Sequence, residues 1–375
     1  MSSDLAPVRV GVIGTGGISN QYLEKAKSFP ILNITRLADL NVDAAKAKAK
    51  QFNIAAAGSV DELLADPSIE LVLNLTIPAA HVPVGLKALD AGKHVFGEKP
   101  LGVSLAEAKL LLDKAKFKNL RVGSAPDTFL GAGIQTARQA IDDGRIGKPV
   151  AFTAFMISRG HEHWHASPAF YYQPGGGPML DMGPYYITAL LNLLGPARRV
   201  MGMASITRPT RTISSKPLAG TEIEVKTADH VMGTIEFANG AVGSVIQSFA
   251  MRAGSGAASP IVIYGTEGTL HVPDPNGFDG PVRLARFDEA GKDEFIDVTH
   301  AFPTGYGRSV GLADMATAIR SSRPHRCSGA LALAALEVMQ AFTDSSEHNR
   351  AVLPQVKFER PAPMSNGLSF GTLDA

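Results

Sequence analysis

The sequence predicts a doubly wound α/β domain at residues 1–125, followed by an α+β domain with a largely antiparallel sheet at residues 126–375. Strand and helix patterns alternate up to about residue 125, as in repeated βαβ units with a parallel sheet. From about residue 200 strand patterns dominate, with turn residues between them. A length of 375 residues also fits two domains, since a domain typically has roughly 150 residues.

In the first half, short apolar or β-branched stretches predict strands at 8–13, 31–39, 71–77, 94–97 and 120–123. Helices are predicted between them at 43–52, 81–91 and 104–116. Ser104 starts the last of these helices and Glu107 follows three residues later, which is the pattern of a capping box. Crossovers between parallel strands are right-handed in nearly all proteins, so the predicted sheet is doubly wound.

In the second half, a helix at 133–144 and a strand at 150–158 precede a glycine-rich loop at 175–178 and a short helix ending near residue 194. Asn239 and Gly240 separate two strand patterns and predict a tight hairpin of 231–237 with 241–249. The remaining elements are predicted as strands at 261–264 and 269–272, a loop at 273–281, and helices at 306–320 and 329–347. The tail after residue 350 is expected to wrap over the surface.

The composition predicts a soluble, cytoplasmic protein. Hydrophobic residues make up 45% of the chain, and 36 Lys and Arg against 35 Asp and Glu give a net charge of +1. This balance excludes the basic footprint of a general nucleic-acid binder. Cys327 is the single cysteine, so no internal disulfide can form, as is typical of a reducing compartment. We expect no signal segment, because the short polar stretch 1–7 is not followed by a basic and then apolar segment. We also expect no membrane span, because no run of about 18 apolar residues exists.

A glycine-rich turn follows the first predicted strand directly. It reads Gly14-Thr15-Gly16-Gly17-Ile18-Ser19 and matches the dinucleotide-binding pattern G-x-G-x-x-G/A except at Ser19. Such glycines let the backbone approach a pyrophosphate, and the helix that follows offers free N–H groups to the phosphates. We therefore expect Gly14, Gly16, Gly17 and Ile18 to contact a dinucleotide. A glycine turn in an unliganded α/β fold is the alternative.

Asp39 ends the second predicted strand, 20 residues after Ser19. A carboxylate at this position accepts hydrogen bonds from the ribose hydroxyls of NAD, and it would repel the 2′-phosphate of NADP. No arginine stands beside it, since the next residues are Leu40 and Asn41. The pattern predicts NAD as the cofactor.

Lys99 stands at the carboxyl end of the fourth predicted strand, within Gly97-Glu98-Lys99-Pro100. Ligands of open parallel sheets bind outside such ends. A lysine there can hold a substrate oxygen or a ribose hydroxyl, and Pro100 restricts the backbone that aims it. The alternative is a surface lysine at a strand end.

Together these motifs resemble the Gfo/Idh/MocA oxidoreductases. The resemblance in the first half is carried by the glycine turn, Asp39, Thr76-Ile77-Pro78 with His81, and Glu98-Lys99-Pro100. It implies a Rossmann domain in which Thr76, Pro78, His81, Glu98 and Lys99 contribute to the cofactor site.

The second half is similar to the family's motif G-G-G-x-x-x-D-x-G-x-H, through Gly175-Gly176-Gly177-Pro178, Asp181 and Gly183. The likeness extends to about residue 347. It implies a substrate domain built on a large open sheet, and NAD(P)-dependent chemistry on sugars or cyclitols. Members commonly pair through the outer face of that sheet, so the resemblance also implies a homodimer or homotetramer.

By the same resemblance, Lys99 acts at the nicotinamide and Asp181 at the substrate. Four residues after that aspartate the family usually has a histidine that accepts the proton of the oxidised hydroxyl, whereas this chain has Tyr185 followed by Tyr186. Asp181 and Tyr185 share a helix face at this spacing. A free tyrosine has a pKa of about 10, which a nearby ammonium group would lower. We expect Lys99, Asp181 and Tyr185 to be catalytic, with a helix N-cap and a packed aromatic as the alternatives for the last two.

Residues 161–165 read His-Glu-His-Trp-His and match H-E-x-x-H, the pattern of zinc proteases. That site requires a helix, which Gly160 and Pro168 disfavour, so we expect no metal. Instead we expect a loop of the substrate pocket, in which Trp164 stacks on a sugar and Arg159 and His163 bind hydroxyls or an anionic group. A surface or interface loop is the alternative. Two further candidate substrate contacts are Asp127 and Tyr186.

Three functions are compatible with these features. The first is an NAD-dependent oxidoreductase in which Lys99 and Asp181 bind a carbinol of a sugar, sugar derivative or cyclitol, and Tyr185 or a water that it orders takes the proton. The second is an NAD-dependent glycosidase that oxidises a ring hydroxyl transiently, eliminates the aglycone, adds water and returns the hydride. The third is a non-catalytic NAD-binding sensor, against which the presence of Lys99 and Asp181 argues. We favour the first.

Overall fold

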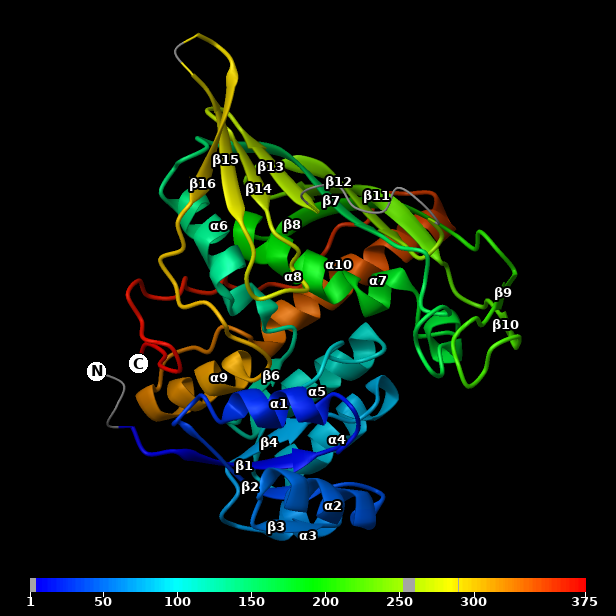
Figure 1. Cartoon of the computed structure of the whole chain (residues 1–375), viewed down its shortest axis with the longest axis vertical. Helices are drawn as coiled ribbons and strands as arrows, with labels where there is room; N and C mark the ends of the chain where they lie inside the picture. Colours follow the sequence, from blue (N-terminus) through cyan, green and yellow to red (C-terminus); the bar gives the residue numbers. More distant parts are fainter. Residues whose placement is uncertain (1–4, 252–259, 289) are drawn as a thin grey trace. The chain divides into compact units, whose positions relative to one another are not determined.

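The computed structural model describes residues 5–251, 260–288 and 290–375 (Figure 1). The chain divides into two compact units. The first unit comprises Met1–Gln135, His300–Leu336 and Pro361–Ala375, and the second comprises Thr136–Thr299 and Glu337–Arg360. This division differs from the predicted boundary after residue 125, because two later segments return to pack with the first unit.

The first unit is built on a parallel six-stranded sheet. In spatial order its strands are β3 (Ala56–Gly58), β2 (Leu32–Ala38), β1 (Val8–Ile13), β4 (Leu71–Asn74), β5 (His94–Gly97) and β6 (Val122–Ser124). The strand order reverses between β1 and β4, which is where open parallel sheets bind ligands. The predicted strands are confirmed, but β3 was missed because its three small residues carry no apolar pattern.

Side-chain caps fix where several helices of this unit begin. The helices are α1 (Ser19–Ala26), α2 (Val42–Phe52), α3 (Val60–Ala65), α4 (Pro78–Asp90), α5 (Leu105–Phe117) and α9 (Val310–Ser321). Ser104 accepts the Glu107 N–H at 3.3 Å, as its sequence pattern predicted. Helix α4 begins at Pro78 rather than at residue 81, because proline is well suited to the first helical position.

Asp314 of α9 is the centre of a buried network that joins the two returning segments of the first unit to each other. Its side chain is fully buried and accepts hydrogen bonds from Arg323 Nη2 at 2.8 Å and from Arg326 N and Nη1, both at 2.6 Å. Arg326 Nη2 in turn bonds Asp374 Oδ2 at 2.5 Å in the C-terminal tail. The tail after residue 350 has no regular helix, and Met364 and Leu373 anchor it by burial.

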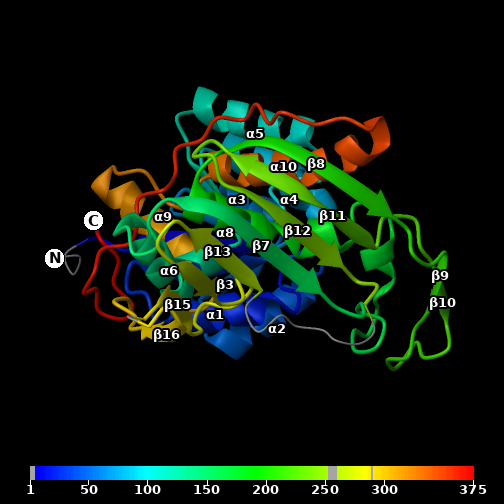
Figure 2. The same ribbon diagram turned by 90° about the horizontal axis from the view of Figure 1, so that it is seen from above.

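The second unit is built on an eight-stranded mixed sheet (Figure 2). In spatial order its strands are β16 (Asp293–Val298), β15 (Val282–Phe287), β14 (Thr269–Val272), β13 (Ile261–Gly265), β7 (Pro149–Ile157), β12 (Val242–Ser248), β11 (His230–Phe237) and β8 (Ala197–Ser205). The β7–β12 pair is parallel and the other pairs are antiparallel, which confirms the predicted fold class. The hairpin at Asn239 and Gly240 is present, with Gly240 at φ +91°.

Helices cover one face of this sheet (Figure 1). They are α6 (Ala132–Asp142), α8 (Gly183–Leu194) and α10 (Gly329–His348), with the short α7 (Pro178–Asp181) before α8. All twelve residues of α8 are buried, so it is a central helix rather than a surface one. Helix α10 packs so closely on β8 that a Cβ at Gly202 would lie 2.5 Å from the Phe342 carbonyl oxygen.

Each unit also contains smaller elements. They are a two-stranded sheet of β9 (Thr210–Thr212) and β10 (Glu222–Glu224), and the 3-10 helices η1 (Thr128–Leu130) and η2 (Ala169–Tyr172). The predicted helix after the glycine loop is in fact two helices, broken at Met182. Across the described part of the chain, no helix has the length and apolar character to span a bilayer.

We predict that Asp314→Ala lowers the free energy of unfolding by about 3–5 kcal/mol, because it leaves buried guanidinium groups without their carboxylate. Urea unfolding measures the change. The matched control is Glu24→Ala, whose pair with Lys27 has side chains 64% and 57% exposed and is worth at most about 1 kcal/mol. Equal losses in the two variants would contradict this assignment.

Candidate functional site

The glycine turn of the first unit leaves open space where a pyrophosphate would lie. Gly14 has φ +98°, and a Cβ there would lie 2.7 Å from the Leu75 carbonyl, so only glycine fits. A Cβ at Gly16 or Gly17 would meet nothing within 4 Å. Ile18 is the N-cap residue of α1, so the turn runs directly into the helix N-terminus. These residues fit the phosphates of a dinucleotide.

Ser19, which departs from the usual pattern, is accommodated without an unsatisfied group. Its side chain is fully buried and its hydroxyl donates a hydrogen bond to the Gly16 carbonyl oxygen at 2.7 Å. The serine side chain therefore stabilises the glycine turn by a hydrogen bond, at a position where the pattern has glycine or alanine.

Asp39 connects the end of β2 to the glycine turn. Its Oδ2 accepts hydrogen bonds from Thr15 N at 2.7 Å and Thr15 Oγ1 at 2.8 Å, and its Oδ1 accepts one from Asn41 N at 3.0 Å. Burial acts to raise the pKa of Asp39, but these hydrogen bonds outweigh it and lower the pKa. The carboxylate is therefore held ionised where the ribose of NAD would bind.

His81 joins the segments that follow β4 and β5. Its side chain is buried, with Nδ1 2.7 Å from the Pro100 carbonyl oxygen and Nε2 3.0 Å from the Thr76 carbonyl oxygen. Asn74 adds to this connection, because it accepts a hydrogen bond from Thr76 Oγ1 at 2.7 Å and donates one to the His81 carbonyl at 2.9 Å. Pro78 begins α4 between them. The structure thus brings these predicted cofactor residues together.

Glu98 fixes the backbone that carries Lys99. Its Oε1 accepts a hydrogen bond from the Tyr22 hydroxyl at 2.7 Å, and its Oε2 accepts one from Lys99 N at 2.9 Å. Burial, with the nearby Glu98 charge, raises the pKa of Tyr22, so this phenol remains a hydrogen-bond donor. The Lys99 side chain is half-buried beyond the end of β5.

Asp127 lies inside the first unit. Its side chain is fully buried, with Oδ2 accepting a hydrogen bond from Gly311 N at 3.1 Å and Oδ1 3.6 Å from Arg308 Nη1. Burial raises its pKa. In this position the carboxylate contributes to packing against α9, and contact with a substrate would require it to be uncovered.

In the second unit, Asp181 pairs with a histidine that the sequence analysis did not single out. Asp181 ends α7, and its Oδ2 lies 2.9 Å from Nε2 of His161, with the two side chains 19% and 13% exposed. Nothing in the sequence ties these residues together, since they lie 20 positions apart. The signal that could have found the pair is the absence of the usual histidine four residues after Asp181, together with three histidines in the preceding loop.

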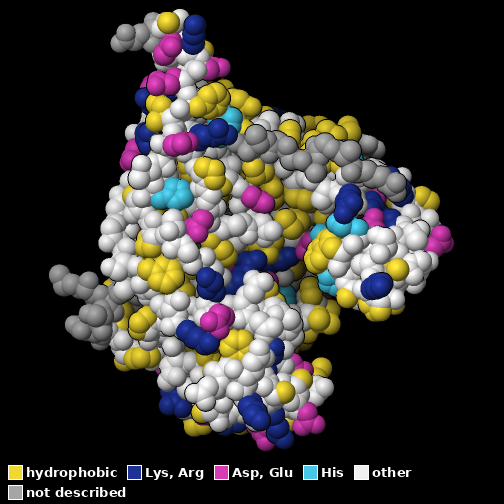
Figure 3. All heavy atoms as spheres, viewed as in Figure 1, with side chains coloured by type: hydrophobic (Ala, Val, Ile, Leu, Met, Phe, Trp, Pro, Cys, Tyr) yellow, Lys and Arg dark blue, Asp and Glu magenta, His cyan; other side chains and the backbone are white. Residues whose placement is uncertain are grey.

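Aromatic rings surround His161. The ring centroid of His161 lies 4.1 Å from that of Tyr171, 4.5 Å from that of Phe249 and 5.2 Å from that of Trp164. Trp164 and Phe170 remain 57% and 55% exposed. Histidine and hydrophobic side chains accordingly gather on the surface near β9 and β10 (Figure 3).

A buried ion network holds the loop that carries His161. The Arg211 side chain is 2% exposed and contacts Glu162 Oε1 at 2.8 Å and Asp229 Oδ2 at 2.7 Å. Tyr172 donates its hydroxyl hydrogen to Glu162 Oε2 and accepts the His161 N–H at 3.1 Å. Burial acts to raise the pKa of Glu162, but Tyr172 and Arg211 stabilise the charge and lower it. Residues 161–165 form a turn rather than a helix, as expected.

The other predicted site residues of the second unit have different surroundings. Arg159 is exposed, and burial with the Arg159 charge lowers the pKa of the half-buried His163. Tyr185 is 6% exposed on the first turns of α8. Tyr186 is directed elsewhere, with its hydroxyl 3.5 Å from Asp274 Oδ1 and its pKa raised by burial.

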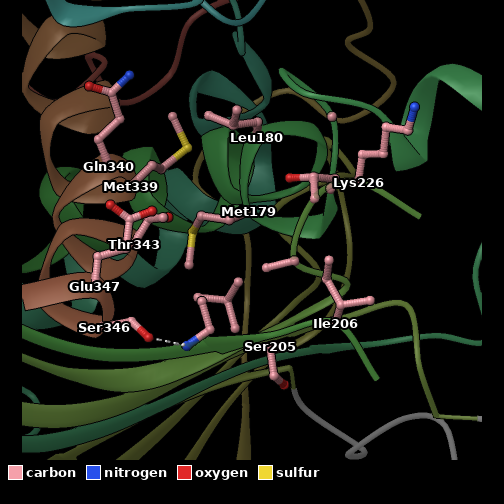
Figure 4. Close-up of a pocket in the computed structure, with 16 residues that line it drawn as sticks. Met179, Leu180, Ser205, Ile206, Lys226, Met339, Gln340, Thr343, Ser346 and Glu347 are labelled. Atoms are coloured by element: carbon pink, nitrogen blue, oxygen red, sulfur yellow. Dashed lines mark hydrogen bonds between the residues drawn. The ribbon is translucent and has the colours of Figure 1, made fainter. Parts of the chain in front are cut away.

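A separate cavity of about 320 Å³ lies beside α7 (Figure 4). Met179, Leu180 and Ile206 contribute apolar surface, and Lys226 and Thr343 contribute polar groups. None of the predicted site residues lines it.

Both halves of the chain match models of one family. Residues 8–125 match "Oxidoreductase family, NAD-binding Rossmann fold", and residues 134–271 match "GFO/IDH/MocA C-terminal domain". The chain belongs to the Gfo/Idh/MocA oxidoreductase family. The predicted family, fold class and cofactor are thereby confirmed: the first unit carries the family's NAD-binding domain, and its glycine turn and Asp39 fit NAD.

Curated relatives include two proteins that are named as dehydrogenases. The chain is 27% identical over 292 residues to levoglucosan dehydrogenase of Pseudarthrobacter phenanthrenivorans, covering 70% of this chain and 73% of that protein. It is 24% identical over 359 residues to myo-inositol 2-dehydrogenase of Thermotoga maritima, covering 92% and 98%. The chain spans about half the length, 54% and 53%, of two uncharacterized oxidoreductases of Schizosaccharomyces pombe, with 33% and 31% identity.

Solved structures agree with this fold. Levoglucosan dehydrogenase in complex with NADH and levoglucosan has a TM-score of 0.79 at 25% identity, covering 93% of this chain and 100% of that chain. An NAD binding oxidoreductase from Klebsiella pneumoniae has a TM-score of 0.80 at 22% identity, covering 93% and 99%.

We predict that Asp39→Ala weakens NADH binding roughly 10- to 100-fold, because a hydrogen bond to a charged group contributes about 1.5–3 kcal/mol. Fluorescence titration gives the Kd. Asp43→Ala is the control, since that exposed carboxylate of α2 pairs only distantly with Lys46, at 3.9 Å. An unchanged Kd in Asp39→Ala would contradict the assignment of the ribose site.

Arg211→Met is predicted to destabilise the second unit by about 3–5 kcal/mol, because Glu162 and Asp229 would face each other without a cation. Urea unfolding again measures the loss. The control is Arg198→Met, because the Arg198 side chain is 72% exposed and its pair with Glu236 is worth at most about 1 kcal/mol. If Arg211→Met unfolds at no lower urea concentration than this control, the network does not hold the loop.

Proposed function

We propose that the protein is an NAD-dependent oxidoreductase that transfers a hydride between nicotinamide and a hydroxyl-bearing carbon of a sugar, sugar derivative or cyclitol. The observation that carries this proposal is the Asp181–His161 pair at 2.9 Å, beside the exposed ring of Trp164. The names of levoglucosan dehydrogenase and myo-inositol 2-dehydrogenase support a substrate with a polyhydroxylated ring.

Exposed groups near the pair suit such a substrate. Trp164 is 57% exposed and offers a large apolar face to the C–H side of a sugar ring. Arg159 is exposed in the same loop and would bind hydroxyls or an anionic substituent, with His163 beside it.

In the proposed reaction, residues of this chain bind the carbinol and accept the proton of its hydroxyl. The Lys99 ammonium binds the reacting oxygen and stabilises negative charge as it develops there. Asp181 orients the groups around the hydroxyl. Tyr185, four residues after Asp181, and His161, in contact with Asp181, are the two groups that could take the proton. NAD, when bound, supplies the hydride acceptor.

The same groups could serve a redox-neutral reaction. An NAD-dependent glycosidase needs one base for the hydroxyl proton and a second for the acidified C–H. Tyr185 and His161 would provide two such groups, and this observation favours glycoside cleavage as the second candidate.

We also propose that the open face of the second unit's sheet pairs two copies into a homodimer or homotetramer. In register across four strands, Met203 lies opposite Met232, Met232 opposite Ile246, and Ile246 opposite Phe155. Met203 and Met232 are 73% and 41% exposed. A row of this kind is apolar surface that a second copy would cover.

The test is one assay with two readouts. Protein with substoichiometric NAD is mixed with sugars, cyclitols and aryl glycosides, neutral and anionic, while NADH absorbance and released aglycone are followed. Stoichiometric NADH without aglycone is expected. Many turnovers of aglycone without net NADH would establish the glycosidase, and binding of NAD with no reaction on any compound would favour the sensor.

Lys99→Ala is predicted to lower kcat roughly 100-fold or more, because the Lys99 ammonium stabilises the negative charge that develops on the reacting oxygen. The exposed Lys87 of α4 gives the control Lys87→Ala, which should match the wild type. Equal turnover in the two variants would remove Lys99 from the mechanism.

A further inference from the structure

We propose that His161, rather than Tyr185, accepts the proton of the substrate hydroxyl, and that Asp181 orients its ring. This inference rests on the proposed function and identifies one of its catalytic residues. The proton acceptor of this chain is not given by the family's motif, because Tyr185 replaces the usual histidine four residues after Asp181.

The contact with Asp181 sets which ring nitrogen is available. Nε2 of His161 lies 2.9 Å from Asp181 Oδ2, and an ionised carboxylate only accepts hydrogen bonds, so Nε2 carries the hydrogen. In the neutral ring Nδ1 then holds the lone pair that takes a proton. The carboxylate also stabilises the imidazolium that forms, as the aspartate does in a Ser-His-Asp triad.

The surroundings hold this ring in one orientation. The rings of Tyr171 and Phe249 pack against it at 4.1 and 4.5 Å between centroids. The backbone N–H of His161 donates a hydrogen bond to the Tyr172 hydroxyl, which holds the main chain that carries the ring. Tyr172 is in turn held by Glu162, which Arg211 neutralises. A proton acceptor positioned in this way loses little freedom when the substrate binds.

His161 also lies beside the surface where we place the substrate ring. Its side chain is 13% exposed, and the Trp164 ring stands 5.2 Å away at an angle of 72°. A polyol stacked on Trp164 would therefore bring its hydroxyls to the side of the pair. Tyr185 is a weaker candidate, since it is buried in α8 at 6% exposure, whereas His161 is half-buried beside the exposed Trp164 ring.

The proposed step is the oxidation of a carbinol, with NAD as the hydride acceptor when it is bound. The O–H bond breaks and its proton passes to Nδ1 of His161, while the C–H bond breaks and its hydrogen leaves with both electrons to the nicotinamide. A C=O bond forms, so the carbinol is oxidised and NAD is reduced. The imidazolium then releases its proton to water before the next turnover.

The experiment compares His161→Ala, His161→Gln and Tyr185→Phe on the compound that the wild type oxidises fastest. We expect both His161 variants to lose kcat roughly 100- to 10,000-fold, the usual contribution of general base catalysis. Tyr185→Phe should lose less kcat than either His161 variant. The control His348→Gln, at an exposed histidine that ends α10, should stay within a few-fold of the wild type. Added imidazole should restore turnover to His161→Ala in a saturable manner and should leave Tyr185→Phe unchanged, which a purely structural role would not produce.

Folding is checked by Tm and by the Kd of NADH, which binds the first unit. Near-wild-type turnover in both His161 variants, loss without rescue by imidazole, or the large loss in Tyr185→Phe instead would overturn the inference. If the wild type reduces no NAD with any compound, the proposed function fails. Equal turnover by the wild type and by His161→Gln would refute the role of His161 but would leave the proposed function standing.

Discussion

The guanidinium of Arg211 is the group on which the candidate catalytic site depends. It is buried between the carboxylates of Glu162 and Asp229, which lie on segments far apart in the sequence. Two carboxylates and a guanidinium are costly to bury separately, so each is tolerable only with the others in place. Through Glu162 and Tyr172, this arrangement fixes the backbone of His161. The position of the His161–Asp181 pair thus depends on the buried charges of Arg211, Glu162 and Asp229.

The first unit depends on a smaller interaction of the same kind. The Asp39 carboxylate accepts two hydrogen bonds from Thr15, and so joins the end of one strand to the turn that follows its neighbour. This residue shapes the glycine turn before any ligand binds. Glu98 acts similarly, because it connects Tyr22 of α1 to the backbone of Lys99. In both cases a carboxylate organises backbone that would otherwise carry unsatisfied donors.

Much of the fold was predictable, and the exceptions have physical causes. Strands with strong apolar runs, and helices with caps such as Ser104, follow from local preference and were found to within a few residues. Strand β3 and the break at Met182 were missed, because three small residues or one kink leave no periodic signal. The return of α9 to the first unit was missed as well. An amphipathic helix shows that it has a buried face, but it does not show which sheet covers that face.

The sequence by itself determined the family, the NAD-binding turn, Asp39 and the position of Asp181, because each is encoded by residues close together in the chain or by a fixed spacing. Only the tertiary structure decided that Asp181 meets His161, that Glu162 is engaged by Arg211, that Asp127 is buried against Gly311, and that Tyr186 meets Asp274. Residues about 20 or 50 positions apart come together through strand order and loop packing. No local pattern carries that information, because a side chain's chemistry shows what it can bind and not which partner the fold brings to it.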